Sequence, residues 1–156
     1  MDEQTYLTHL MQAEQTLYHV AATLLRGEDD RKDAMQETAL RIWQNRGKLR
    51  EERYFTTWAV RIMINVCRTM HRKTGRMLPE ACVPERPAPP GEDVELRVLL
   101  DGLPERFRLP LVLYYLEGFS VDEIARATGT PTGTVKYRLH QARKALRVEL
   151  DDGKEG

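Results

Sequence analysis

Residues Ser120–Arg147 read SVDEIARATGTPTGTVKYRLHQARKALR, and this stretch predicts two short helices joined by a tight turn. Ser120 and Glu123 have the spacing of a capping box, in which each side chain accepts a hydrogen bond from a backbone N–H at the start of the first helix. Gly129 predicts the end of that helix, where a left-handed residue is common. The Thr-Pro pair that follows predicts an N-cap and a first-turn proline for the second helix. This is the layout of a helix-turn-helix, whose second helix lies in the major groove of DNA.

The second predicted helix has an apolar side and a basic side. Apolar residues recur at steps of three and four, which indicates an amphipathic helix. They are Val135, Leu139, Ala142, Leu146 and Leu150. The opposite side carries Lys136, Tyr137, His140, Gln141 and Lys144. Basic side chains bind phosphates without reading sequence, whereas an amide or an ammonium group can pair with base edges. DNA binding is therefore favoured over the alternative, a solvated basic face in an ordinary helical bundle.

The charge of the chain is balanced overall but unevenly distributed. Lys and Arg together number 24, as do Asp and Glu, so the formal net charge is zero. Residues Ile124–Val148 nevertheless contain six basic residues and no acid, and residues Arg53–Pro79 also contain six basic residues and no acid. Two basic segments separated by acidic ones predict two contact surfaces for an anionic partner.

Several classes of function find no support in the composition. Two cysteines are too few for a disulfide framework, and no Cys-x-x-Cys or Cys/His cluster indicates a metal site, so we expect no cofactor. Cys67 lies among apolar residues and is expected to be a small core side chain. No nucleophile–base pair or phosphate-binding loop indicates an enzyme. The start of the chain lacks the pattern of a signal peptide, and no apolar run is long enough for a bilayer, so a cytoplasmic protein is expected.

Helical periodicity without strand patterns predicts an all-α fold. A first apolar stripe runs from Tyr6 to Leu25, and Asp29 and Asp30 are expected to interrupt it. A second helix is expected from about Arg31 to Arg46, with Met35, Ala39, Ile42 and Trp43 buried. After an exposed loop, a third helix is expected to begin near Tyr54, with Trp58, Ile62, Val66 and Met70 on one face.

A proline-rich segment divides the chain into two small helical domains. Five of the eight prolines fall between Arg76 and Val94, where a helix cannot continue. The predicted organisation is therefore a first domain over residues 1–75, a linker over 76–94, a second domain over 95–150 and a tail over 151–156. Within the second domain, Pro110 is expected to bend or tighten a helix that spans Glu105–Glu117.

Both halves resemble one known family. The segment LPERFRLPLVLYYLEGFSVDEIARATGTPTGTVKYRLHQARKALR is similar to region 4 of sigma factors of the sigma-70 family. The segments DAMQETALRIWQ, from Asp33, and YFTTWAVRIMINVCRTMHRK, from Tyr54, resemble region 2. A chain with only these two regions and a short linker resembles the extracytoplasmic-function (ECF) group. The resemblance implies a sigma factor that binds core RNA polymerase and directs promoter-specific transcription initiation at −10 and −35 elements.

The resemblance also implies roles for three sets of residues. For opening and reading the −10 element, with Asn65 at an extruded base, it points to Arg50, Arg61, Asn65, Arg68, Arg72 and Lys73. For the −35 element it points to Lys136, Tyr137, His140 and Gln141 at base edges and Arg138 and Arg143 on phosphates, beside Lys144. For docking on the clamp coiled coil of the largest polymerase subunit it points to Asp33, Gln36, Glu37 and Arg41.

Some positions depart from the usual pattern of the family. Tyr137 stands where a serine is common, Gln141 where an arginine is common, and Thr69 where an aspartate is frequent, so we expect an altered promoter preference. The resemblance further implies an anti-sigma factor as a regulatory partner. Two other functions stay open on the residues alone: a stand-alone helix-turn-helix transcriptional regulator, and a helical adaptor whose basic faces bind acidic proteins. Contact between the two halves in the absence of polymerase is also left open.

Overall fold

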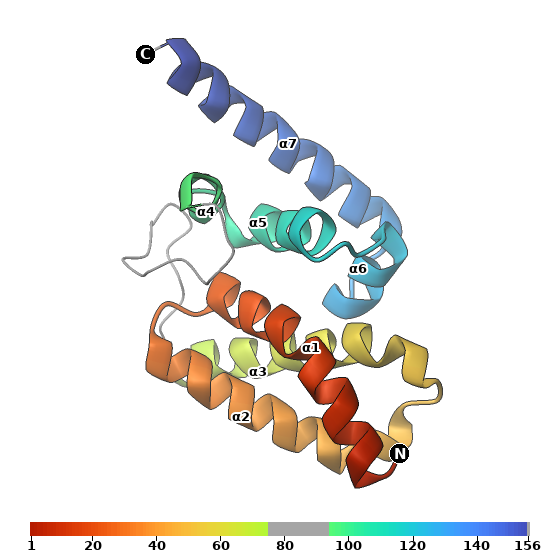
Figure 1. Ribbon diagram of the computed structural model, residues 1–156. Coiled ribbons are helices and arrows are strands. Elements are labelled where there is room, and N and C mark those ends of the chain that lie inside the picture. The colour runs from red at the N-terminus through yellow and green to blue at the C-terminus, as the bar shows by residue number, and fades with distance from the viewer. Residues whose placement is uncertain (75–93, 156) are drawn as a thin grey trace.

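The computed structural model describes residues 1–74 and 94–155 (Figure 1). Within these ranges every regular element is helical and no strand occurs, so the predicted all-α fold is confirmed. The helices form two groups along the chain, which lie one above the other in Figure 1. The linker predicted for residues 76–94 lies outside the described residues, except that Val94 begins a helix. None of the described helices is both long enough and apolar enough to span a bilayer.

The first group consists of α1 (Glu3–Leu24), α2 (Glu28–Gln44) and α3 (Phe55–Thr74). Apolar side chains with almost no exposed surface form its core, and each contributes about 1.5–3 kcal/mol by leaving water. They include Leu17, Val20, Ile42, Met63 and Ile64. Nε2 of His71, near the end of α3, lies 2.8 Å from the carbonyl oxygen of Leu24. This bond satisfies a carbonyl group at the end of α1, where no intrahelical donor is left.

The boundary between α1 and α2 differs from the prediction. Asp29 and Asp30 do not interrupt a helix; with Glu28 they form the first turn of α2, and Gly27 is its N-cap. The reason is electrostatic, because carboxylates stabilise the partly positive N-terminus of a helix. The buried guanidinium of Arg31 then holds the break between the helices by donating to the carbonyl oxygens of Leu25, at 3.2 Å, and Arg26, at 2.7 Å.

Helix α3 buries more of its faces than a single apolar stripe predicts. Of the four predicted residues, only Val66 is fully buried, while Trp58, Ile62 and Met70 are partly buried. The residues of α3 with at most 2% of their surface exposed also include Phe55, Ala59, Val60, Met63, Ile64 and Cys67. Helices α1, α2 and α6 all contact α3. A helix that is covered from several directions needs apolar residues on more than one face, so a single stripe underestimates its burial.

The loop between α2 and α3 contains two short 3₁₀ turns, η1 (Arg46–Lys48) and η2 (Glu52–Tyr54). The predicted exposure of this loop agrees with the structure, since most of its residues, Arg50 among them, are exposed. From α1, the imidazole of His9 stacks on Phe55 with the ring centres 5.1 Å apart. Its Nε2 lies 3.3 Å from a carboxylate oxygen of Glu52. These contacts join the loop to the first helix.

The second group consists of α4 (Val94–Asp101), α5 (Glu105–Leu111), the π-helical turn η3 (Val112–Leu116), α6 (Val121–Thr128) and α7 (Thr132–Glu155). Helix α7 is the long helix at the top of Figure 1, and its C-terminal end projects away from the other helices. The helix predicted for residues 105–117 is therefore divided: Pro110 lies in α5, which ends one residue later, and η3 follows. A proline donates no backbone hydrogen bond, which fits a local change of helical geometry here.

The predicted helix-turn-helix features are present in α6 and α7. The Glu123 N–H donates to Oγ of Ser120 at 3.1 Å, and the Ser120 N–H donates to Oε1 of Glu123 at 3.0 Å, which completes the capping box. Gly129 has φ +69°, the left-handed conformation that a residue with a Cβ adopts only at a cost. The predicted apolar side of α7 is buried at Val135, Leu139 and Ala142 and partly buried at Leu146. The side chain of Leu150 lies outside the described part.

The two groups of helices are in contact, although they are far apart in the chain. Helix α6 lies on α3, and α5 lies against α1. In the second of these contacts, the buried guanidinium of Arg108 donates from Nη2 to the carbonyl oxygen of Thr23 at 3.0 Å. The question that the sequence left open is therefore answered for this structure: the halves touch.

Candidate nucleic-acid interface

The side chains predicted to read the −10 element lie together on the exposed side of α3. Arg61, Asn65, Arg68 and Arg72 follow one another at steps of four, three and four, and all are exposed. Lys73 is exposed as well. This spacing places the first four residues on one face of the helix. The other sides of α3 are buried in the core. The structure thus brings five of the six predicted residues onto one helix, and the sixth, Arg50, lies in the preceding loop.

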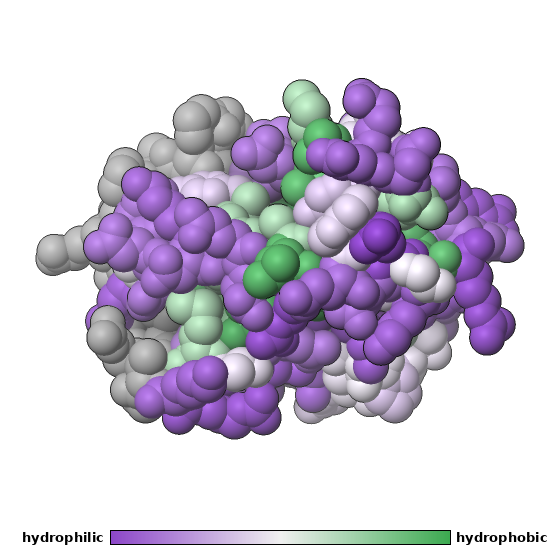
Figure 2. Space-filling view, turned by 90° about the horizontal axis from the view of Figure 1, so that it is seen from below, coloured by the Kyte–Doolittle hydropathy of each residue, from purple (hydrophilic) through white to green (hydrophobic). Residues whose placement is uncertain are grey.

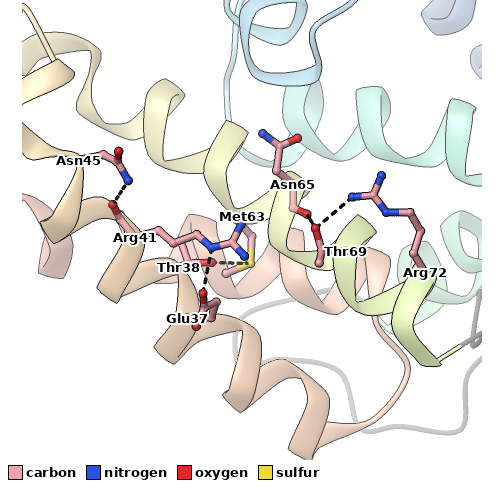
Figure 3. A network of polar contacts seen from close by, with 8 residues as sticks. All are labelled: Glu37, Thr38, Arg41, Asn45, Met63, Asn65, Thr69 and Arg72. Atoms are coloured by element: carbon pink, nitrogen blue, oxygen red, sulfur yellow. Dashed lines mark hydrogen bonds and ion pairs between the residues drawn. The ribbon is translucent and has the colours of Figure 1, made fainter.

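A threonine that the sequence analysis noted only as a departure connects two of these residues. The hydroxyl of Thr69 donates to the backbone carbonyl oxygen of Asn65 at 2.9 Å and accepts from Nη2 of Arg72 at 3.1 Å. Figure 3 shows the Arg72 side chain turned back along α3 toward Thr69, while the Asn65 amide points away from α2. The arrangement leaves the Asn65 amide exposed and directs the Arg72 guanidinium toward the same face.

Asn65 also borders a pocket of about 300 Å³ between α2, η1 and α3. The pocket is lined by Arg41, Asn45, Lys48, Trp58, Arg61, Ile62 and Asn65. Three cationic groups and two amides offer many hydrogen-bond donors, and an indole offers a flat apolar wall. A small planar group that carries hydrogen-bond acceptors suits such a lining.

Four residues that line this pocket were not predicted as site residues: Asn45 and Lys48 were missed, and Trp58 and Ile62 were expected only on the apolar face of α3. Asn45 is the C-cap of α2, and its Nδ2 donates to the carbonyl oxygen of Arg41 at 2.8 Å. This bond uses a donor of the amide and leaves its oxygen as an acceptor. An asparagine at the end of a predicted helix, directly before a basic loop, was the available signal. Asn45 and Asn65 line the same pocket because α2 and α3 pack together, and no local sequence pattern shows this packing.

The residues predicted to dock on polymerase follow one side of α2. Asp33, Gln36 and Glu37 are exposed, and Arg41 is half-buried. Nε of Arg41 donates to Glu37 at 2.9 Å, as Figure 3 shows. Leu40, between them in sequence, is 50% exposed. Figure 2 views the molecule from the side of the first three helices, and its surface is mainly hydrophilic with separate hydrophobic patches. Arg41 belongs both to this set and to the lining of the Asn65 pocket.

The residues predicted to read the −35 element lie on the outer side of α7. Lys136, Tyr137, His140 and Lys144 are exposed, and Tyr137 reaches 62% exposure. Arg138 and Gln141 are half-buried at the edges of this face. The buried side of α7 packs against α5 and α6, so the outer side is open to a partner.

Arg143 is the exception in this set, because it faces another part of the molecule. Its Nε donates to the hydroxyl of Tyr115, and its guanidinium carbon lies 5.5 and 5.6 Å from the ring centres of Tyr115 and Tyr114. It also lines an apolar pocket of about 350 Å³ together with Leu100, Leu111, Tyr115, Leu116, Leu146 and Arg147. Arg143 lies three residues after His140 and seven after Lys136, so it is next to them on α7, but its guanidinium is engaged with Tyr115. Its predicted contact with phosphate stays a prediction.

The expectations for Cys67 and for metal binding concern parts of the chain outside the exposed faces of α2, α3 and α7. Cys67 is buried in the core, and burial, with a smaller effect of the Glu105 carboxylate, raises the pKa of its thiol to about 12. The thiol is therefore protonated near neutral pH, as befits a core side chain. In the described ranges, no group of three or more His, Cys, Asp or Glu side chains has the arrangement of a metal site.

Comparison with known proteins identifies the family to which these faces belong. The family model for sigma-70 region 2 matches residues 10–77, and the model for sigma-70 region 4 matches residues 93–146. The ECF RNA polymerase sigma factor SigE of Mycolicibacterium smegmatis is 32% identical over 147 residues, which cover 86% of this chain and 57% of the relative. This chain thus spans little more than half the length of that relative. The domain boundaries drawn from the sequence stay a prediction.

Two further matches extend over most of both proteins. The ECF RNA polymerase sigma factor EcfG of Rhodopseudomonas palustris is 32% identical over 138 residues, which cover 83% of this chain and 76% of the relative. A solved structure of the sigma factor RpoE in complex with the anti-sigma factor NepR from Bartonella quintana has a TM-score of 0.78 at 24% identity, covering 94% of this chain and 96% of that chain. With both regions matched in order and a relative of this similarity, the chain belongs to the sigma-70 family of RNA polymerase sigma factors, in its ECF group.

Proposed function

We propose that this chain is a promoter-specificity subunit, which binds core RNA polymerase and directs initiation by recognising a −10 element through α3 and a −35 element through α7. The observation that supports it best is the presence of two separate exposed basic helix faces in one member of the ECF group. Polymerase performs the chemistry, and the chain itself is not an enzyme. It acts in the cytoplasm together with polymerase.

At the −10 element, α3 stabilises the melted form of the DNA. Arg68, Arg72 and Lys73 hold the phosphates of the separated strand, and the exposed amide of Asn65 accepts and donates at a base edge. An unstacked base enters the pocket beside Asn65, where Trp58 provides a flat wall. Because these contacts require a separated strand, they bind open DNA more tightly than duplex DNA and shift the equilibrium toward opening.

At the −35 element, α7 lies in the major groove of duplex DNA. Lys136, Tyr137, His140 and Gln141 face the base edges, while Arg138 and Lys144 bind phosphates at the sides of the groove. The 62% exposed ring of Tyr137 adds a large group at a position where the family commonly has a serine. We expect this ring to change which base pair is preferred there.

Two protein partners complete the proposal. The exposed side of α2, with Asp33, Gln36 and Glu37, docks on the clamp coiled coil of polymerase. An anti-sigma factor holds the chain inactive until a signal releases it. This second partner is proposed from membership of the group and from the similar sigma factor RpoE, which was solved in complex with the anti-sigma factor NepR.

Run-off transcription tests the proposal directly. Purified chain and core polymerase are supplied with a library of random promoters, and transcripts are sequenced. We expect a distinct set of promoters with two shared elements, and no specific transcript from core polymerase alone. Tight and specific duplex binding by the chain alone, without any effect on polymerase, would favour the stand-alone helix-turn-helix regulator instead. Failure to associate with core polymerase would refute the proposal.

A further inference from the structure

Thr69 stands between two residues of the −10 face and is bonded to both of them (Figure 3). Its hydroxyl donates to the backbone carbonyl oxygen of Asn65 at 2.9 Å and accepts from Nη2 of Arg72 at 3.1 Å. Thr69 is half-buried, whereas Asn65 and Arg72 are exposed. The threonine therefore supports the exposed face from beside it.

The first of these bonds determines how the second can form. A threonine hydroxyl has one hydrogen and two lone pairs. Its hydrogen is used on the carbonyl oxygen one turn back, a bond that threonine commonly makes inside a helix, so the oxygen is left as an acceptor. That acceptor receives the N–H of Arg72, three residues on and on the same side of the helix. Because threonine is branched at Cβ and stiff at χ1, the acceptor is held in place.

This bond orders a side chain that is otherwise mobile. An arginine has several rotatable bonds, and fixing them costs conformational entropy. A guanidinium has five N–H groups, and the bond to Thr69 is made through Nη2. The other donors stay available for phosphate oxygens, in an orientation that is set before a strand arrives. Less entropy is then lost when the strand binds.

The acceptor on Thr69 is neutral, which matters for a residue that is to attract phosphate. A carboxylate at position 69 would also hold the guanidinium, because opposite charges three residues apart on a helix attract each other. It would, however, cancel the charge that draws the phosphate. Helix α3 contains no Asp or Glu in its sequence. On this helix, therefore, Arg72 is oriented by a group that leaves its charge in place.

We infer that Thr69 is a positioning residue of the −10 face, whose hydroxyl holds the guanidinium of Arg72 beside Asn65, ready for a phosphate of the separated strand. The inference rests on the proposed function, because it names the group that prepares one of the strand contacts. Thr69 acts only through Arg72. Removal of the hydroxyl should therefore weaken strand capture, and an acid in its place should remove the contribution of the arginine's charge.

Three variants of Thr69, each loaded on core polymerase, test this inference. The probe is a labelled single strand with the −10 sequence of a promoter selected by run-off transcription, and its binding is measured at several salt concentrations. Thr69→Val keeps the shape but removes the hydroxyl, so binding should be about fivefold weaker with the same salt dependence. Thr69→Ser restores the hydroxyl and should bind within about twofold of the wild type. Thr69→Asp should lower the slope of log affinity against log salt by about 0.7, one phosphate contact on a single strand.

A double-mutant cycle distinguishes positioning of the arginine from a general effect on α3. In a chain that already carries Arg72→Ala, Thr69→Val should change strand binding by less than about twofold, because no guanidinium is left to hold. Thr8→Val is the matched control, since Oγ1 of Thr8 also donates to a carbonyl oxygen four residues back, that of Gln4 at 3.0 Å, but on α1. It should bind the strand as the wild type does. Circular dichroism verifies that all variants are folded.

The outcomes separate the inference from the proposed function. If Thr69→Val weakens binding equally with and without Arg72, or if Thr69→Ser does not restore binding, the threonine does not act by positioning the arginine and the inference is wrong. If Thr69→Val and Thr69→Asp bind the strand as the wild type does, the inference is again wrong, while the sigma-factor function stands. If the wild-type chain with core polymerase supports no promoter-specific transcription, the proposed function fails and the inference falls with it.

Discussion

Helices α3 and α7 present the two basic faces of the molecule, and they differ in what else those faces touch. On α3, Arg61 is bound to the end of α6, and the neighbouring Thr57 is bound to Glu123. On α7, the outer residues Lys136 and His140 are exposed, and their side chains make no hydrogen bond to the described part of the chain. One face is partly engaged inside the molecule, whereas the other is open.

The difference is that α3 takes part in packing the two groups of helices together, whereas α7 packs within its own group. The proposed roles fit this difference, because phosphate and base-edge contacts on α7 need no melting, whereas the proposed base contact of Asn65 requires a separated strand.

The largest expected effect concerns the division of α7 into a buried and an open side. Leu139→Ala removes a side chain that is 2% exposed, so we expect the free energy of unfolding to fall by about 2–5 kcal/mol. Urea unfolding followed by circular dichroism measures it. Tyr137→Ala, on the open side, is the control and should stay within about 0.5 kcal/mol of the wild type. Equal losses would mean that α7 is not divided in this way.

The next effect separates base contacts from phosphate contacts on the open face. Lys136→Ala should weaken use of the −35 element by about 1–3 kcal/mol if the ammonium group donates to a base edge. Run-off transcription from promoters that differ only in the −35 element measures the loss. A base contact predicts a loss that depends on the base pair. Equal loss on every promoter would make Lys136 a phosphate contact, and no loss at all would remove it from the interface.

The features of α6 that depend on a few adjacent residues were predictable from the sequence. The capping box of Ser120 and Glu123 and the left-handed Gly129 each follow from backbone chemistry within one turn. The open side of α7 was also predictable, since it is the complement of an apolar stripe. Local rules sufficed because these groups find their partners within four residues of themselves.

Features that depend on contacts between distant residues were not predictable in this way. Arg61 and Arg126 are 65 positions apart, and no periodicity of α3 marks the carbonyl oxygen that Arg61 will meet. The wider burial of α3 has the same origin, because α6 covers part of it. The start of α2 was missed for a different reason: acids were taken as a break, although a helix N-terminus stabilises them.

A smaller effect is expected at the −10 face. Asn65→Ala removes the amide proposed to meet an extruded base, which should lower the stability of open promoter DNA by about 1 kcal/mol, roughly a fivefold change. Permanganate reactivity of unpaired thymines measures opening, and binding to core polymerase should not change. Gln44→Ala removes an exposed amide from α2 outside the pocket and serves as the control. Unchanged opening in Asn65→Ala would contradict the assignment.

The smallest expected effect sharpens the comparison within α7 itself. Arg143 is engaged with Tyr115, so Arg143→Ala should change DNA affinity by less than about 0.5 kcal/mol. Lys144→Ala, on the open side, should instead lower the salt dependence of binding by about one phosphate contact. Titration of duplex DNA at several salt concentrations distinguishes the two.

If Arg143→Ala lowers the salt dependence as much as Lys144→Ala, then Arg143 exchanges the Tyr115 hydroxyl for a phosphate on binding. In that case Tyr115→Phe, which removes the acceptor but keeps the ring, should strengthen DNA binding, because the guanidinium would no longer give up a hydrogen bond to reach the phosphate.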